Sequence, residues 1–130
     1  MIILTIRTDK PEAEIGLYDD DRQLAYETWQ AHRQLAETVH CKVEVLLRGQ
    51  GKMWADLEGV ACFQGPGSFT GLRIGLTVAN ALSYSYGLPV AATQDPHWLE
   101  TGIERLRRGE RDELALPFYG AEAHITPQKK

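Results

Sequence analysis

The 130-residue chain is poor in cysteine and carries a formal net charge of only −4. Cys41 and Cys62 lack the paired spacing of metal ligands, and no secretory signal precedes them. We therefore interpret both as reduced core residues of a cytoplasmic protein. The small negative charge does not favour an autonomous nucleic-acid binder or a polybasic membrane patch. Any RNA in its function is expected to be held by another protein.

Charge is nearly absent from residues 68–86, where Arg73 is the one formally charged side chain. The stretch approaches the ~20 apolar residues of a membrane-spanning helix. Arg73, Asn80 and several serines and tyrosines argue against that reading, and we expect no membrane contact. A helix this apolar cannot hide its whole circumference inside so small a fold, so part of it is expected to meet another protein.

The sequence offers little for catalysis. His32 and His40 are eight residues apart rather than at metal-ligand spacing, and no acid–base pair stands out, so we predict no catalytic or metal-ligating residue. The turn at residues 65–68 has no P-loop lysine. It is a candidate phosphate loop because it precedes a helix; alternatively its glycines only permit close packing. The candidate residues are Gly65, Gly67 and Ser68.

Hydrophobic periodicity predicts alternating strands and helices. We expect Ser68 to cap the apolar helix and Gly87 to end it. Three antiparallel strands continued by parallel strands through crossover helices form an α/β mixed sheet of the ribonuclease-H-like, actin-type class. The predicted strands are 1–6, 12–18, 23–29, 60–63, 89–92 and 114–119, and the predicted helices are 31–48, 68–86 and one that Asp95 and Pro96 open.

The apolar helix has two different faces. Gly71 and Gly75 lie four residues apart, with Val78 and Leu82 nearby, and small residues let another backbone approach. The other face packs elsewhere. Two largely apolar stripes predict two neighbours, the sheet on one side and helix 31–48 with a foreign helix pair on the other.

A long block of the chain resembles the TsaB family, also called YeaZ. The resemblance covers roughly residues 1 to 92 and is most specific around the glycine-rich turn. The matching segments are Ile2-Ile3-Leu4-Thr5-Ile6, Trp54-Ala55-Asp56-Leu57-Glu58-Gly59-Val60-Ala61, Gly65-Pro66-Gly67-Ser68-Phe69-Thr70-Gly71-Leu72-Arg73-Ile74-Gly75-Leu76, Ala79-Asn80-Ala81-Leu82 and Gly87-Leu88-Pro89-Val90.

The resemblance implies a non-catalytic scaffold and activator built on an actin-like ATPase lobe. Its partners would be a TsaD-like catalytic subunit and a TsaE-like ATPase, in the complex that places a threonylcarbamoyl group on the adenosine beside the anticodon. Transfer RNA would be met only through that complex, and the chain alone would form a homodimer. No cofactor is implied, and a nucleotide is expected only at a partner interface.

The resemblance also implies a partner interface on the two helices that begin near His32 and at Ser68. The implied interface residues are His32, Leu35, Val39, Gly71, Leu72, Gly75, Leu76, Val78, Ala79 and Leu82. The alternative hypothesis is a small nucleotide-binding or hydrolytic enzyme of the same superfold, which would use residues 65–68 for phosphate.

Two departures from the family pattern affect these expectations. Family members carry Asp-Thr after the first strand, whereas this chain has Arg7-Thr8 there, and a cation in place of that acid makes hydrolysis less expected. Family members also have a second lobe of comparable size, which we expect this chain to lack. We predict a single first lobe over residues 1–120 and a tail over 121–130.

Overall fold

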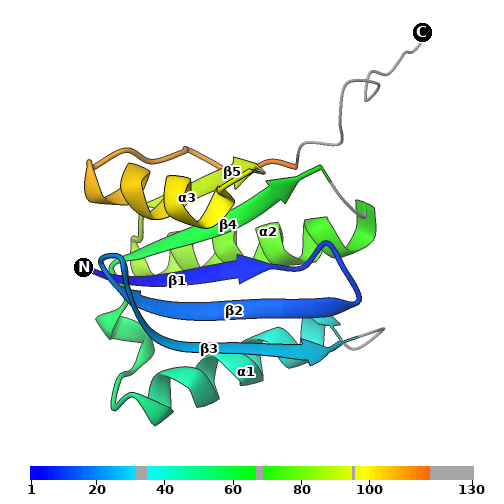
Figure 1. The fold of residues 1–130 in the computed structure, drawn as a ribbon, viewed down its shortest axis with the longest axis horizontal. Helices are drawn as coiled ribbons and strands as arrows, with labels where there is room; N and C mark the ends of the chain where they lie inside the picture. Colours follow the sequence, from blue (N-terminus) through cyan, green and yellow to red (C-terminus); the bar gives the residue numbers. More distant parts are fainter. Residues whose placement is uncertain (32–34, 67–68, 95, 118–130) are drawn as a thin grey trace, which may run out of the picture.

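The computed structural model describes residues 1–31, 35–66, 69–94 and 96–117. Five strands form one sheet in the order β3-β2-β1-β4-β5, and helices cover both of its faces (Figure 1). The strands are β1 (Ile2–Arg7), β2 (Glu12–Asp19), β3 (Arg22–Gln30), β4 (Gly59–Gly65) and β5 (Val90–Gln94). The helices are α1 (Leu35–Gly49), the short 3-10 helix η2 (Trp54–Asp56), α2 (Phe69–Tyr86) and α3 (Trp98–Arg107).

The predicted mixed sheet is confirmed. β1, β2 and β3 pair antiparallel, with Leu4 opposite Leu17 and Ile15 opposite Glu27. β4 and β5 continue the sheet in parallel, because each is reached through a crossover helix rather than a hairpin. Nearly every β4 residue is buried, as expected for a strand covered on both faces.

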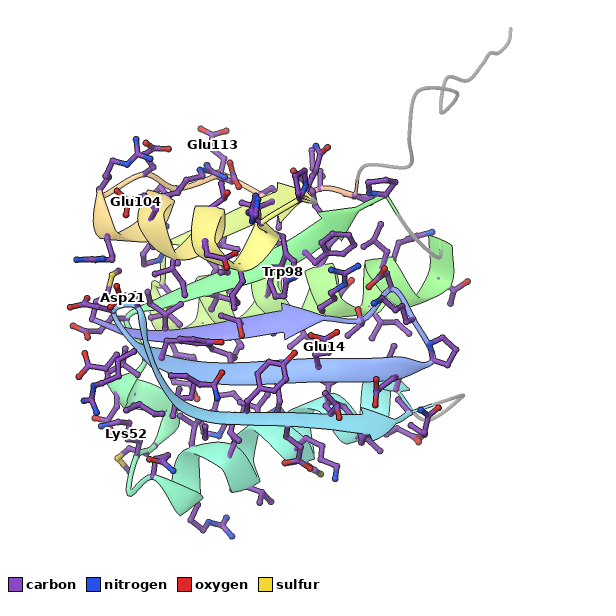
Figure 2. All side chains as sticks on the ribbon, in the orientation of Figure 1. Glu14, Asp21, Lys52, Trp98, Glu104 and Glu113 are labelled. Atoms are coloured by element: carbon purple, nitrogen blue, oxygen red, sulfur yellow. The ribbon has the colours of Figure 1, made fainter. Side chains whose placement is uncertain are left out.

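The helices divide between the two faces of the sheet. Figure 1 shows α1 and α2 behind the strands and α3 in front of them. Behind the sheet, apolar side chains of the strands and of α1 and α2 make the larger core. In front, α3 packs on β4 and β5 with Ile103 and Leu106 buried. The rings of Phe63 and of Trp98, labelled in Figure 2, pack edge to face with their centroids 6.0 Å apart.

The structure confirms the predicted end of α2 but not the predicted start of α3. α2 ends as expected, because Gly87 has a φ of +66° and the following amide, of Leu88, donates to the Ser83 carbonyl at 3.1 Å. The predicted cap Ser68 lies outside the described residues. α3 begins at Trp98 rather than at Pro96, because His97 has a φ of +65° that interrupts the helical backbone. Asp95 lies outside the described residues.

The predicted last strand over residues 114–119 is wrong for its described part. Leu114–Pro117 form no strand, and residues 118 and 119 are not described. The reason is that Asn80 of α2 takes the place of a neighbouring strand. Its side chain accepts from the Ala115 amide at 2.8 Å and donates to the Ala115 carbonyl at 3.0 Å.

Cys41 is exposed, contrary to the prediction that both cysteines are core residues. Val39 and Val43 define the buried stripe of α1, and Cys41 falls halfway between them on the helix's other side. Cys62 of β4 is buried as predicted.

Candidate functional site

The helix layer behind the sheet is fixed to it by apolar and polar contacts. α1 packs on β2 and β3, α2 packs on β1, β4 and β5, and the two helices touch each other. The Trp29 indole N–H donates to the Thr38 hydroxyl at 3.1 Å, and the Lys42 ammonium pairs with the Glu27 carboxylate at 2.8 Å. These contacts join α1 to β3. The two helices therefore present one defined surface to solvent.

Most predicted interface side chains face the protein's own core. They pack against the sheet and between the two helices, so their apolar surface holds α1 and α2 in place. The buried members are Leu35, Val39, Leu72, Leu76, Ala79 and Leu82. Val78 is half-buried, and His32 lies outside the described residues. A partner that lies on this layer would meet mainly the residues beside the buried ones.

Gly71 and Gly75 let another backbone approach, and that backbone is the chain's own turn between β1 and β2. The Thr8 hydroxyl donates to the Gly71 carbonyl at 2.6 Å and accepts from the Gly75 amide at 3.1 Å. A Cβ atom at Gly71 would lie 2.3 Å from the Thr8 carbonyl oxygen, and one at Gly75 would lie 2.3 Å from the Thr8 hydroxyl oxygen. The two glycines thus seat α2 on the β1–β2 turn.

The solvent side of α2 has little charge. Its residues recur at three- and four-residue spacing and form one stripe, in which Ile74 and Val78 are half-buried and the others are exposed. We call this stripe the outer helix surface; it consists of Thr70, Arg73, Ile74, Thr77, Val78 and Ala81. Arg73 is its one charged residue. Surface helices usually turn charged and polar side chains to solvent, so such a composition is typical of a face that another protein covers.

Three aromatic rings stack in a line from α1 to the end of α2. We call them the aromatic stack: His40 of α1, Trp54 of η2 and Tyr86 of α2. The His40 and Trp54 ring centroids are 4.7 Å apart with planes 20° apart, and those of Trp54 and Tyr86 are 6.4 Å apart with planes 10° apart. His40 and Tyr86 are exposed and Trp54 is half-buried. Sequence reasoning missed the stack, because its three members belong to elements that no local pattern brings together.

A second group lies where β1 ends. The Arg7 guanidinium makes two bonds to the Asp9 carboxylate, at 2.8 and 3.2 Å, and lies over the Phe63 ring at 3.8 Å. The Arg7 and Asp9 side chains are only 12% and 7% exposed. The cation that replaces the family acid is thus paired two residues further on. An Arg-x-Asp sequence across a turn is the signal that could have predicted this pair.

The candidate phosphate loop is described only at its start. Gly65 has a φ of +122°, which favours glycine, whereas Gly67 and Ser68 lie outside the described residues. The phosphate loop therefore stays a prediction. A hollow of about 300 Å³ opens beside the β1–β2 turn, lined by Thr8, Asp9, Lys10, Pro11, Ala31, Leu35, Thr70, Gly71 and Ile74.

The described ranges hold no group of three or more histidine, cysteine or acidic side chains arranged for a metal ion. Burial raises the pKa of the Cys62 thiol, so this side chain is a packing residue and not an activated nucleophile. Over the same described ranges, no helix has the length and apolarity needed to cross a bilayer.

Comparison with known families and curated proteins shows relatives in tRNA modification. The family model for TsaD, tRNA N6-adenosine threonylcarbamoyltransferase, matches residues 29–102, more than half of the chain. A Geotalea uraniireducens protein of that name is 32% identical over 73% of this chain and 28% of its own length. The Bacillus subtilis tRNA threonylcarbamoyladenosine biosynthesis protein TsaB is 32% identical over 93% of this chain and 51% of its own length. The chain thus spans at most about half of these relatives.

Solved structures share the fold. YeaZ from Pseudomonas aeruginosa superposes with a TM-score of 0.63 at 29% identity, over 73% of this chain and 45% of that one. RuvC from Thermus thermophilus superposes with a TM-score of 0.53 at 16% identity, over 92% of this chain and 86% of that one. These matches confirm the predicted ribonuclease-H-like fold.

Proposed function

Because the chain belongs to the TsaB/YeaZ family and matches the model of the related TsaD transferase, we propose that it acts in tRNA threonylcarbamoyladenosine biosynthesis. Its role is that of a non-catalytic scaffold and activator that binds a TsaD-like catalytic subunit. A TsaE-like ATPase and tRNA join through the complex that these two subunits form. Alone, the chain pairs with itself through the same surface.

The low charge of the outer helix surface supports this proposal. The stripe crosses the middle of α2 and includes the half-buried Ile74 and Val78, which are already partly desolvated. Covering such a surface costs little charge desolvation and removes apolar area from water. The outer helix surface is the observation that carries the partner-binding role.

The family match supports a partner of related shape. The matched residues 29–102 include both α1 and α2, and curated relatives include TsaD as well as TsaB proteins. Two related lobes that each carry this helix pair can pack face to face about a pseudo-two-fold axis, as helix pairs do in bundles. We therefore place the TsaD-like subunit over the outer helix surface.

A charge at an exposed position of this surface tests the placement. Thr77→Lys puts a second cation in the middle of the stripe, four residues after Arg73, where a partner would bury it without a counter-charge on the stripe. We expect its dissociation constant for the cognate TsaD-like subunit, measured by titration calorimetry, to rise at least tenfold, or about 1.4 kcal/mol.

The matched control makes the same substitution on the opposite side of the sheet. Thr101 is an exposed threonine of α3, so Thr101→Lys has the same change in charge and size and should bind as the unchanged protein does. Equal affinity of both variants would remove the outer helix surface from the interface. Calorimetry with ATP and Mg²⁺ at millimolar concentration tests the alternative of a nucleotide-binding enzyme, and heat of specific binding would favour it.

A further inference from the structure

The aromatic stack has more exposed ring surface than its packing role requires. Tyr86 is 45% exposed, and His40 is exposed on the other side of Trp54. Neither ring is needed to close the core, whose apolar residues lie underneath. Tryptophan and tyrosine are the residue types that most often dominate binding energy at protein interfaces.

Trp54 is held in place by the short turn that carries it. The Asp56 carboxylate accepts from the Met53 amide at 2.9 Å, and the Asp56 and Leu57 amides donate to the Met53 and Trp54 carbonyls at 2.9 and 3.1 Å. With a ring stacked on each side, the indole loses little conformational freedom when another molecule covers it. A side chain ordered in advance gives more net binding energy than one that must be ordered on contact.

A hollow of about 360 Å³ opens beside the stack. It is lined by Glu44, Leu47, Arg48, Lys52, Met53 and Trp54. Leu47 is buried, whereas the Met53 side chain is 65% exposed and flexible enough to fit a neighbour. The Arg48 guanidinium and the Glu44 carboxylate pair at 2.9 Å, which balances their charges and leaves Lys52 as the net charge of the lining. Figure 2 labels Lys52 of this group, beyond the end of α1. Leu47, Met53 and Trp54 give the hollow an apolar part that suits an apolar side chain.

We propose that the aromatic stack and the adjoining hollow form the anchor of the partner interface, and that the hollow receives an apolar side chain from a helix of the TsaD-like subunit. This inference rests on the proposed function. The stack joins α1 to the end of α2, so a partner that lies across both helices covers it. The stack also makes the interface specific, because a partner must offer a large apolar side chain next to Trp54.

Truncation of the two stack members outside α1 tests the anchor. In calorimetric titrations with the cognate TsaD-like subunit, Tyr86→Ala and Trp54→Ala should each raise the dissociation constant at least tenfold. Tyr26→Ala is the control, since Tyr26 is 42% exposed but lies on β3 in the register that faces away from α1, beside Gly16 and Tyr18. Its affinity should stay within about twofold of the unchanged protein.

A spectroscopic readout does not depend on truncation. In fluorine NMR spectra of protein labelled with 5-fluorotryptophan, the Trp54 resonance is identified as the one that is missing from the spectrum of the Trp54→Phe variant. It should shift when the partner is added, whereas the resonances of Trp29 and Trp98 should stay in place. A stationary Trp54 resonance in a protein that binds, or unchanged affinity of both truncated variants, overturns the anchor and leaves the proposed function standing. Failure of the unchanged protein to bind overturns both.

Discussion

Thr8 decides how closely α2 approaches the β1–β2 turn. The residue is 2% exposed, and its one hydroxyl donates to the Gly71 carbonyl and accepts from the Gly75 amide. Both glycines are needed because any Cβ would meet an atom of Thr8, but the atoms differ. At Gly75 the obstacle is the side-chain hydroxyl, and at Gly71 it is the backbone carbonyl oxygen.

This difference predicts that removal of the Thr8 hydroxyl compensates for an alanine at position 75 but not for one at position 71. Gly75→Ala gains about 1 kcal/mol of helix propensity, but overpacking costs roughly 1–3 kcal/mol and the hydrogen bond to Thr8 is strained. We expect a net loss of about 1 kcal/mol in the free energy of unfolding, measured by urea denaturation. In a Thr8→Ala background, Gly75→Ala should cost nothing or stabilise, because the obstructing hydroxyl is gone.

Gly71→Ala provides the comparison. The Thr8 carbonyl oxygen is present in both backgrounds, so Gly71→Ala should destabilise the protein whether residue 8 is threonine or alanine. If Gly75→Ala costs the same in both backgrounds, the hydroxyl is not the obstacle at this contact.

At the residue scale, spacing alone predicted part of this arrangement. Two glycines four residues apart correctly indicated a close backbone approach to α2. The pattern could not tell a foreign backbone from the chain's own turn, because it contains no information about Thr8, more than 60 residues away. The Arg7–Asp9 pair does not follow from the replacement of the family acid by Arg7 alone, because the pair also requires the acid two residues later.

Among the elements, α3 is joined to the segment that follows it by ion pairs of Arg105 with Glu110 and Asp112. The Arg105 guanidinium donates to the Asp112 carboxylate at 2.8 and 3.3 Å and to the Ala92 carbonyl at 3.2 Å. The same carboxylate accepts from the Ala92 amide of β5 at 2.7 Å. Burial alone would raise the pKa of Asp112, but the hydrogen bonds from Arg105 and Ala92 outweigh burial and lower it.

The lowered pKa gives a pH dependence with a definite sign. A carboxyl group whose pKa is lower in the folded state stabilises the fold above its unfolded pKa of about 3.8, and that stability is lost as the pH falls through the folded value. Because the pair is partly exposed, Asp112→Asn should cost only about 1 kcal/mol at pH 7. The difference between variant and unchanged protein, measured by urea denaturation at several pH values, should shrink below pH 4.

Glu113→Gln is the matched control. Glu113 is the exposed neighbour of Asp112, labelled in Figure 2, and its substitution removes the same charge. It should change the free energy of unfolding by less than about 0.5 kcal/mol. A constant Asp112→Asn difference from pH 3 to pH 7 would contradict the assignment of this pH dependence to Asp112.

The positions of the strands and helices could largely be predicted from the sequence, but the neighbours against which they pack could not. Alternation, apolar runs and helical periodicity located the five strands and three α-helices among the described residues, because each element turns apolar side chains toward the core. The same stripes were assigned partly to a partner, although Leu72, Leu76 and Ala79 lie in the core. Residues buried in the chain's own core and residues buried by a partner have the same apolar spacing in the sequence. The aromatic stack could not be predicted, because it depends on where η2 lies relative to both helices.

For the molecule as a whole, the two faces of the sheet have different roles. The front carries α3, whereas the back carries the helix layer with the outer helix surface and the aromatic stack (Figure 1). The proposed interface therefore lies wholly on elements between residues 35 and 86, all within the segment that matches the TsaD family model. We therefore expect this chain to contain every element needed to bind its partner.

Light scattering on a sizing column tests that claim most directly. The chain and its cognate TsaD-like subunit would be run separately at micromolar concentration and then mixed. We predict a new peak whose mass exceeds that of the TsaD-like subunit by 14.6 kDa, one copy of this chain. Two unchanged peaks in the mixed sample would contradict the scaffold role, because the helix layer would then not suffice to bind the partner.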